Sequence, residues 1–168
     1  MDVYTAVKSI LAVRSYQDRL VPPEALDRIL EAGRLSASSM NGQPWRFIVI
    51  EDREMLRRIG ELVKTGPYIA DAPLAIAVAV EQTRFAVSDA SRAIQNMLLT
   101  AWADGIGSNW AGFGGMDNVK QALGIPNNLD LLAILPFGYP AQEVGKGEKK
   151  RKPRAEVVFH ERYGQPFS

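Results

Sequence analysis

The sequence contains no cysteine and a single histidine, His160, among its 168 residues. The absence of cysteine excludes disulfides, thiolate zinc sites and a cysteine nucleophile, and it is consistent with a reducing compartment. A histidine-rich metal site is excluded too, and we expect His160 on the surface of a helix near the C-terminus. No serine lies in a GxSxG motif. We therefore predict no catalytic side chain and no metal, so that if the protein is an enzyme its reactive group is a cofactor.

Strong net charge and long N-terminal apolar runs are also missing. The chain has 20 Lys and Arg against 19 Asp and Glu, a formal net charge of +1, so it lacks the broad attraction on which nucleic-acid binding depends. Residues 1–16 include Asp2, Lys8 and Arg14, and they resemble neither a signal peptide nor a membrane-spanning segment. We expect a cytoplasmic protein with no nucleic-acid or membrane partner.

The exception in charge is segment 146–154, which holds six basic residues and one acidic residue. Lys149 and Arg151 belong to this segment, on an expected flexible connector. Arg14 and Ser15 lie between the first two expected helices, and both places suit a phosphate group. The ordinary alternative is that this basic segment is a solvated tail. A third alternative is a nucleic-acid adaptor with a basic tail, which would show steeply salt-dependent binding of RNA or DNA.

Hydrophobic periodicity divides the chain into helices and strands. Apolar residues at helical spacing predict helices at 2–11, 22–35, 53–63, 89–103, 117–123 and 155–164. Runs of β-branched and aromatic residues predict strands at 46–50, 74–80 and 131–137. The unbroken run at 74–80 is typical of a strand covered on both faces. The composition, 46% hydrophobic and 23% charged, is that of one globular domain over residues 1–168, and the interleaved order predicts an α+β fold with helices on a mixed sheet.

A polar stretch at 36–43 directly precedes the predicted strand that begins after Trp45. It contains three serines, Asn41, Gly42 and Gln43. Amide side chains both donate and accept hydrogen bonds, and hydroxyls turn either way, so this stretch suits the edge of a flat, heteroatom-rich ring. The ordinary alternative is a polar turn at Asn41 and Gly42, with Trp45 anchoring the core.

The segment 105–115 has five glycines in eleven residues, which predicts a loop or a strained strand. It does not follow a predicted strand and open a helix at the spacing of a dinucleotide-binding turn, so a Rossmann phosphate site is not indicated. A tight structural turn is the ordinary interpretation of these glycines.

Three ordered motifs, nearly from end to end, resemble the FMN-dependent nitroreductase family. The first is VRSYQDRLVPPEALDRILEAGRLSASSMNGQPWRFIVI, which resembles the family's Arg-Ser pair, helix, serine-rich turn, N-x-Q-P-W and strand. The second, DASRAIQNMLLTAWADGIGSNWAGF, is similar to its central helix and glycine-rich segment. The third is LAILPFGYP followed by KKRKP and a final helix.

This resemblance implies a three-layer sandwich with a mixed central sheet flanked by helices, assembled as an intertwined homodimer with two FMN sites at the interface. The basic residues and Ser15 would meet the phosphate or ribityl chain, the polar residues at 38–43 the polar edge of the ring, and segment 110–112 would lie beside the ring. The implied cofactor-binding residues are Arg14, Ser15, Tyr16, Ser38, Ser39, Asn41, Gln43, Trp110, Ala111, Gly112, Lys149 and Arg151.

The resemblance also implies a ping-pong oxidoreductase, in which NAD(P)H reduces FMN and an electron-poor small molecule such as a nitroaromatic or quinone is then reduced at the same site. The alternative is a non-catalytic flavin or deazaflavin binding module. The physiological substrate and the choice between NADH and NADPH stay open, because one scaffold hosts several chemistries.

Three positions depart from the family pattern. Val13 stands where a second basic residue is usual, Gln17 where Lys or Arg is common, and Ala37 where proline is common. Losing a cationic contact is expected to weaken phosphate binding by roughly 1 to 3 kcal/mol. Because the chain is short for the family, we expect it to lack the extra helices that cover the flavin and select substrates in other members.

Overall fold

A four-stranded sheet forms the centre of the molecule, with strand order β1-β2-β4-β3. The structure, a computed structural model, describes residues 1–112, 116–144 and 149–167. The end of the predicted glycine-rich segment, 113–115, and part of the basic run, 145–148, lie outside these residues. The strands are β1 (Trp45–Ile50), β2 (Leu74–Glu81), β3 (Gly107–Ser108) and β4 (Leu129–Gly138). All three predicted strands are therefore present.

The named strands pair antiparallel. Phe47 lies opposite Val78, Ile76 opposite Leu135, and β3 joins the other side of β4 through the pair of Gly107 with Gly138. A parallel bridge between Ala12 and Ser108 adds the N-terminal segment beside β3. Within β2 every residue except Glu81 is buried, which confirms the prediction of a strand covered on both faces.

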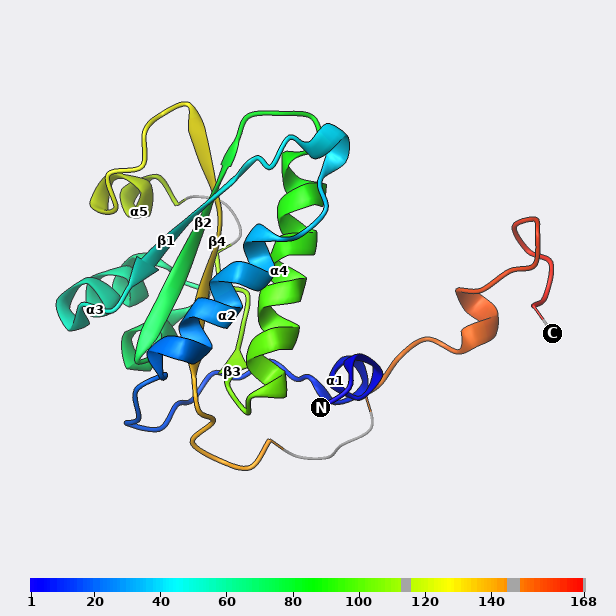
Figure 1. Ribbon diagram of the computed structural model, residues 1–168, viewed down its shortest axis with the longest axis horizontal. Coiled ribbons are helices and arrows are strands. Elements are labelled where there is room, and N and C mark those ends of the chain that lie inside the picture. The colour runs from blue at the N-terminus through cyan, green and yellow to red at the C-terminus, as the bar shows by residue number, and fades with distance from the viewer. Residues whose placement is uncertain (113–115, 145–148, 168) are drawn as a thin grey trace.

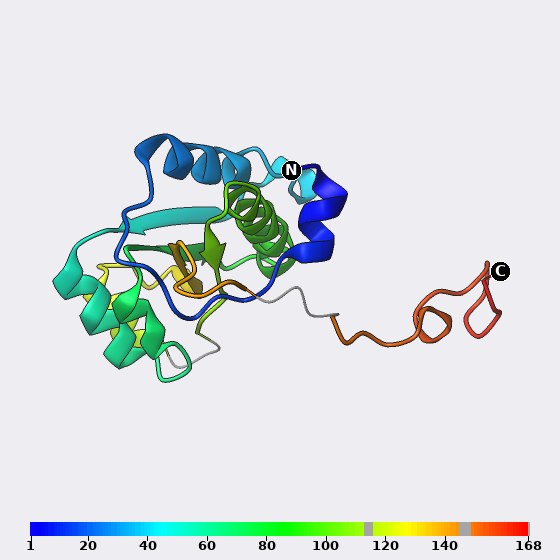
Figure 2. The same ribbon diagram turned by 90° about the horizontal axis from the view of Figure 1, so that it is seen from below.

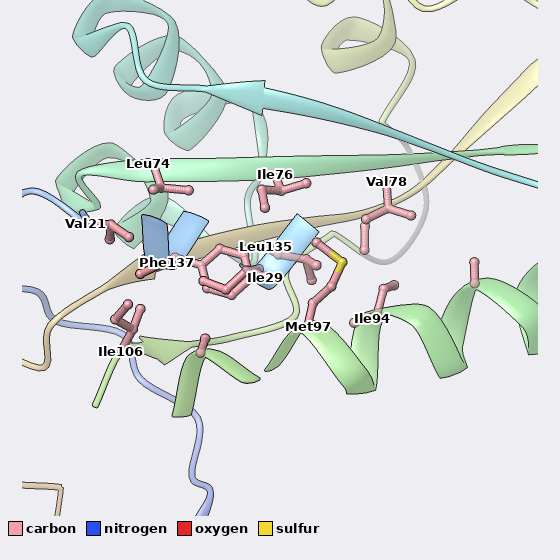
Figure 3. Packing of buried hydrophobic residues seen from close by; sticks show 14 of the residues in the cluster. Val21, Ile29, Leu74, Ile76, Val78, Ile94, Met97, Ile106, Leu135 and Phe137 are labelled. Atoms are coloured by element: carbon pink, nitrogen blue, oxygen red, sulfur yellow. The ribbon is translucent and has the colours of Figure 1, made fainter. Parts of the chain in front are cut away.

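Two helices cover one face of the sheet, α2 (Pro23–Arg34) and α4 (Ala86–Ala103). Alternate side chains of β2 and β4 point toward these helices because successive residues of a strand face opposite sides. Figure 3 shows this core, in which Ile76 and Leu135 of the sheet meet Ile29 of α2 and Met97 of α4.

The other face carries α3 (Arg53–Leu62), the short helix η2 (Pro67–Asp71) and α5 (Asp117–Ala122). The intervening side chains of the same strands, among them Ala77 and Ile134, pack there against Leu56 and Ile59. Figures 1 and 2 show helices on both sides of the sheet. The fold is thus the predicted three-layer α+β sandwich.

The remaining helix of the body, α1 (Val3–Ser9), lies at the C-terminal end of α4. There the indole N–H of Trp102 donates to the hydroxyl of Ser9 over 2.8 Å. This contact places the N-terminal segment close to the last turn of α4.

Residues 149–167 form an arm that extends away from the body in both views (Figures 1 and 2). The helix predicted at 155–164 is wrong, because the arm contains only the short helix η3 (Arg154–Glu156) and a bridge between Phe159 and Pro166. Helices in proteins depend mainly on burial of an apolar face, and the arm buries none against its own chain. His160 accordingly does not lie on a helix, contrary to expectation.

Gly60 of α3 offers a test of the packing that holds η2. A Cβ at Gly60 would lie 2.9 Å from the amide nitrogen of Ala70 and 2.9 Å from the carbonyl oxygen of Pro67, both backbone atoms. Gly to Ala in a helix interior normally stabilises by roughly 0.5 to 1 kcal/mol. We expect Gly60→Ala instead to lower the free energy of unfolding by about 1 to 3 kcal/mol, because the backbone of η2 must shift. Urea unfolding checks this, with Glu61→Ala on the exposed face of α3 as the control; a stabilised Gly60→Ala would contradict it.

Candidate functional site

The polar turn predicted at 36–43 lies beside the first turn of α4 (Figure 1). It contains the short helix η1 (Ser39–Asn41). Three of its non-glycine residues adopt the left-handed region, with φ of 52° for Met40, 55° for Asn41 and 47° for Gln43. Each such residue costs on the order of 1 to 3 kcal/mol unless its surroundings hold it. Contacts with the rest of the protein must therefore hold the backbone of the turn in this conformation.

Hydrogen bonds inside the turn tie its two ends together. The backbone N–H of Gln43 donates to the hydroxyl oxygen of Ser38 over 3.0 Å. The side-chain amide of Gln43 donates to the side-chain oxygen of Asn41 over 3.2 Å. Both amide side chains are exposed, so the turn presents them on the surface.

A buried carboxylate anchors the turn to α4. Asp89 is 2% exposed, and it accepts from both the backbone N–H and the hydroxyl of Ser39, each over 3.0 Å. Sequence analysis missed this residue. The signal was present, since Asp89 lies on the same helix face as Ala86 and Ala93, where an apolar residue is expected.

The N-terminal group, Arg14, Ser15 and Tyr16, lies instead near β3 and the end of β4. The N–H of Val13 donates to the carbonyl of Ser108 over 2.9 Å, and the carbonyl of Ser15 accepts from Ala141 over 3.0 Å. Val13 is buried, and its side chain packs directly against Gly107. A valine at this position therefore fills the interior, which accounts physically for the departure from a basic residue.

Arg14 is exposed and forms a small cluster with residues that sequence analysis did not single out. Its guanidinium lies 6.0 Å from the ring centre of Tyr68. The Tyr68 hydroxyl in turn accepts from the side-chain amide of Asn109 over 2.5 Å. η2 thus brings Tyr68 between Arg14 and the segment that contains Trp110. An aromatic residue in the loop TGPYIADAP was the only hint in the sequence.

The segment 110–112 runs along β4. Ala111 is 1% exposed and exchanges two backbone hydrogen bonds of 2.9 Å with Ile134. Trp110 is half-buried and packs against the core between the sheet and α4. Gly112 has φ +86°, and a Cβ there would collide with the side chain of Met116. Glycine is required at 112 by both the backbone angle and this close approach.

One cation of the arm, Lys149, contacts the N-terminal helix α1. The ammonium of Lys149 donates to the carbonyl of Val7 over 2.8 Å, and Arg151 donates to the carbonyl of Lys150 over 2.9 Å. Lys149 and Gln17 both line a cleft of about 1180 Å³ between α1, the end of α4 and residues 140–144. Lys149 thus contacts Val7 of α1, whereas Arg14 lies over Tyr68 of η2, so these two cations have different partners in the described chain.

The expected site residues thus divide into two groups. The amide-rich turn lies at the N-terminal end of α4, whereas Lys149 and Ser15 lie near its C-terminal end, as the contacts of Asp89 and Trp102 with their neighbours show. Because α4 has 18 residues, its ends are about 27 Å apart at a rise of about 1.5 Å per residue. Within a single chain the two groups of site residues therefore lie far apart, at opposite ends of α4.

The chemistry of the two groups is complementary to a phosphorylated heterocycle. Among the residues that the structure describes, no carboxylate lies within ion-pair distance of Arg14, Lys149 or Arg151. Such cations are available for an anion. The turn at 38–43 offers amide and hydroxyl groups that both donate and accept.

Comparison with known proteins identifies relatives over most of the chain. The sequence profile of the nitroreductase family matches residues 11–83 and 64–139. A protein of Methanothermobacter thermautotrophicus, provisionally named an NADH dehydrogenase/NAD(P)H nitroreductase, is 38% identical over 154 residues, which cover 86% of this chain and 81% of the relative. An NAD(P)H FMN reductase of Bacillus subtilis is 27% identical over 177 residues, or 90% of this chain and 70% of the relative.

Solved structures agree with this relationship. An FMN-dependent nitroreductase from Clostridium difficile is similar with a TM-score of 0.85 and 27% sequence identity, covering 94% of this chain and 98% of the other. The likeness therefore extends to the arrangement of the layers as well as to the sequence.

Tyr16 provides a test of how the N-terminal group is held. Its hydroxyl donates to the carbonyl of Val13 over 2.8 Å, so Tyr16→Phe should lower the free energy of unfolding by about 1 kcal/mol at neutral pH. Burial raises the pKa of Tyr16 above its ordinary value of 10.0, with Tyr68 adding to the shift and Arg14 opposing it. A raised pKa in the folded state means that this stabilisation is complete below about pH 10 and is lost as the pH rises further.

Denaturant unfolding at about pH 8 and about pH 11 should therefore show the wild type and Tyr16→Phe converging at the higher pH. Tyr163→Phe is the matched control, because Tyr163 is 92% exposed on the arm. A gap between wild type and Tyr16→Phe that is constant or wider at high pH would contradict the assignment.

Proposed function

The chain belongs to the nitroreductase family, and from this we propose that it is an FMN-dependent NAD(P)H oxidoreductase that reduces electron-poor small molecules such as nitroaromatics or quinones. The observation that carries the proposal is the family match over most of the chain, joined to a donor set that fits FMN. One group holds cations with no ion-pair partner among the described residues, and the other is an amide-rich turn.

FMN, when bound, supplies the redox chemistry by accepting electrons from NAD(P)H and passing them to the acceptor. The chain's own residues bind and orient it. Arg14, Ser15 and the arm cations would hold the phosphate end, and Ser38, Ser39, Asn41 and Gln43 would face the polar edge of the ring. Residues 110–112 would lie beside the ring, with Tyr16 bracing the segment of Arg14 through its bond to Val13.

No side chain of this chain has to act as a nucleophile. Its contribution is to position groups of fixed charge and polarity where negative charge increases during reduction, which is the usual way that a protein assists a cofactor. The side-chain amide N–H groups of Asn41 and Gln43 in the turn are donors of this kind. Substrate choice depends on what shapes the open side of the ring.

A homodimer is part of the proposal. A single chain keeps the two groups of site residues at opposite ends of α4, so a complete site is more readily formed where two chains meet. The arm supports this, because it leaves the body in both views (Figures 1 and 2) and exposes Val157, Tyr163 and Phe167. Val3 and Tyr4 on α1 are exposed too, at 76% and 72%. Apolar side chains gathered at a surface are typical of an interface between subunits.

The chain is proposed to act as one FMN-binding domain over residues 1–168, in the cytoplasm. The absence of cysteine supports a reducing compartment. None of the helices in the described parts of the chain combines the length and the apolar character that crossing a bilayer requires.

The first test is the purified protein loaded with FMN. We expect flavin absorption bands in the visible spectrum, bleaching of those bands by NADH or NADPH under anaerobic conditions, and recovery on adding a nitroaromatic or a quinone. A protein that binds FMN tightly but is reduced by neither nicotinamide would favour the non-catalytic flavin module. A protein that stays colourless with excess FMN would contradict the proposed function.

The second test asks whether one site is built from two chains. Arg14→Ala and Asn41→Ala each remove one side of the site, and each homodimer should retain little FMN. Co-expression with two different tags and purification through both gives a mixed dimer. If the site is shared, one of its two sites carries both substitutions and the other neither, so about half of the wild-type flavin should remain bound. If both groups served one chain, every site would carry one substitution and the mixed dimer would retain no more flavin than either variant.

A further inference from the structure

Three residues of α4 contact the segment that leads into the polar turn. The side-chain amide of Asn96 donates to the hydroxyl oxygen of Ser36 over 2.6 Å, and Arg92 donates to the carbonyl of Ala37 over 3.5 Å. Asp89 then accepts from Ser39 twice, as described above. Residues 89, 92 and 96 are spaced by three and four, so they lie on one face of the helix. One face of α4 therefore holds the chain from Ser36 to Ser39.

Asp89 differs from its two neighbours in burial and in the place it holds. It is 2% exposed, whereas the side chain of Arg92 is 53% exposed, and Asn96 is exposed. Its partner Ser39 immediately precedes Met40 and Asn41, the first two left-handed residues. Ser38, on the other side of Ser39, binds the backbone of Gln43. The contact of Asp89 with Ser39 therefore constrains the strained part of the turn on both sides, directly next to Met40 and through Ser38 at Gln43.

The carboxylate of Asp89 finds its hydrogen-bond and ion-pair partners within the chain. Its carboxylate receives the N–H and O–H of Ser39 and lies 3.3 Å from the guanidinium of Arg92. Removing these partners would leave a buried, unpaired carboxylate and strongly destabilise the folded protein. The contact is therefore specific and resists rearrangement. This is the property needed to hold a backbone conformation that the turn does not favour on its own.

We propose that Asp89 is a positioning residue for the cofactor: by fixing Ser39 it holds the turn 38–43 in the shape that presents Asn41 and Gln43 to the flavin ring. The inference rests on the proposed function, because it concerns the same FMN site. Asp89 itself is buried behind the turn, so it acts through Ser39 rather than by touching the ring.

The test is Asp89→Asn, which keeps the size of the side chain and one acceptor oxygen but removes the charge. We expect the FMN dissociation constant, measured by fluorescence titration of the apoprotein, to rise about ten-fold. Because the turn would face the edge of the ring that becomes more negative on reduction, the reduced cofactor should lose about ten-fold more affinity than the oxidised one. That difference corresponds to a midpoint potential lower by about 30 mV for a two-electron couple.

Two comparisons distinguish a positioning role of Asp89 from a purely structural one. Asp104→Asn is the matched control, since it removes an ion pair between α4 and Arg28 at the other end of the helix; the FMN dissociation constant and the potential should stay at wild-type values. In a double-mutant cycle, the losses of FMN affinity from Asp89→Asn and Asn41→Ala should be clearly less than additive, because both act through one turn. Additive losses with an unchanged potential would show that Asp89 merely stabilises the fold, and would overturn the inference.

The outcomes also separate this inference from the proposed function. If wild type and Asp104→Asn bind FMN and Asp89→Asn binds it equally well at the same potential, the positioning role is wrong while the flavoenzyme stands. If the wild type binds no FMN, the proposed function has failed first. Should Asp89→Asn not fold, Ser39→Ala removes one of the two hydrogen bonds and leaves the N–H bond in place. It should raise the FMN dissociation constant about three-fold or more, and wild-type affinity in that variant would equally overturn the inference.

Discussion

The structure depends on a strand that has no polar face. The residues of β2 are buried from Leu74 to Val80, so neither side of the sheet can be left to water, and helices must cover both. That requirement brings α2 and α4 to one side and α3, η2 and α5 to the other. It also fixes where the ends of α4 lie, and those ends carry the two halves of the candidate site.

Most of the architecture could be predicted because it follows from local patterns. The run at 74–80 and the spacing of Leu56 and Ile59 appear directly in the sequence, and each predicted element of the body is present. The helix expected at 155–164 failed because its apolar residues have no partner within the chain. The sequence marks Asp89 only as a carboxylate on an apolar helix face and Tyr68 only as an aromatic residue in a loop. Their partners Ser39 and Asn109 lie 50 and 41 residues away in sequence, and no local pattern records those contacts.

The division of the candidate site follows from the same geometry. Resemblance to the family grouped residues by motif, and the sequence order of those motifs says nothing about distance. In the structure, α4 (Ala86–Ala103) lies between the strained turn and the cation-bearing segments, and the proposed homodimer rests on that separation. The assignment of the polar turn to the cofactor stays a prediction, while the buried carboxylate of Asp89 that holds its unfavourable backbone is seen only in the packing.

The arm has a consequence for the life of the protein in the cell. An exposed segment at a chain end is a preferred point of attack for proteases, and the exposed side chains of Val157, Tyr163 and Phe167 on it offer a place for chaperones or aggregation to begin. A newly made chain would carry this liability until something covers residues 149–167. A partner that packed against the arm would therefore also shield the chain from cleavage there.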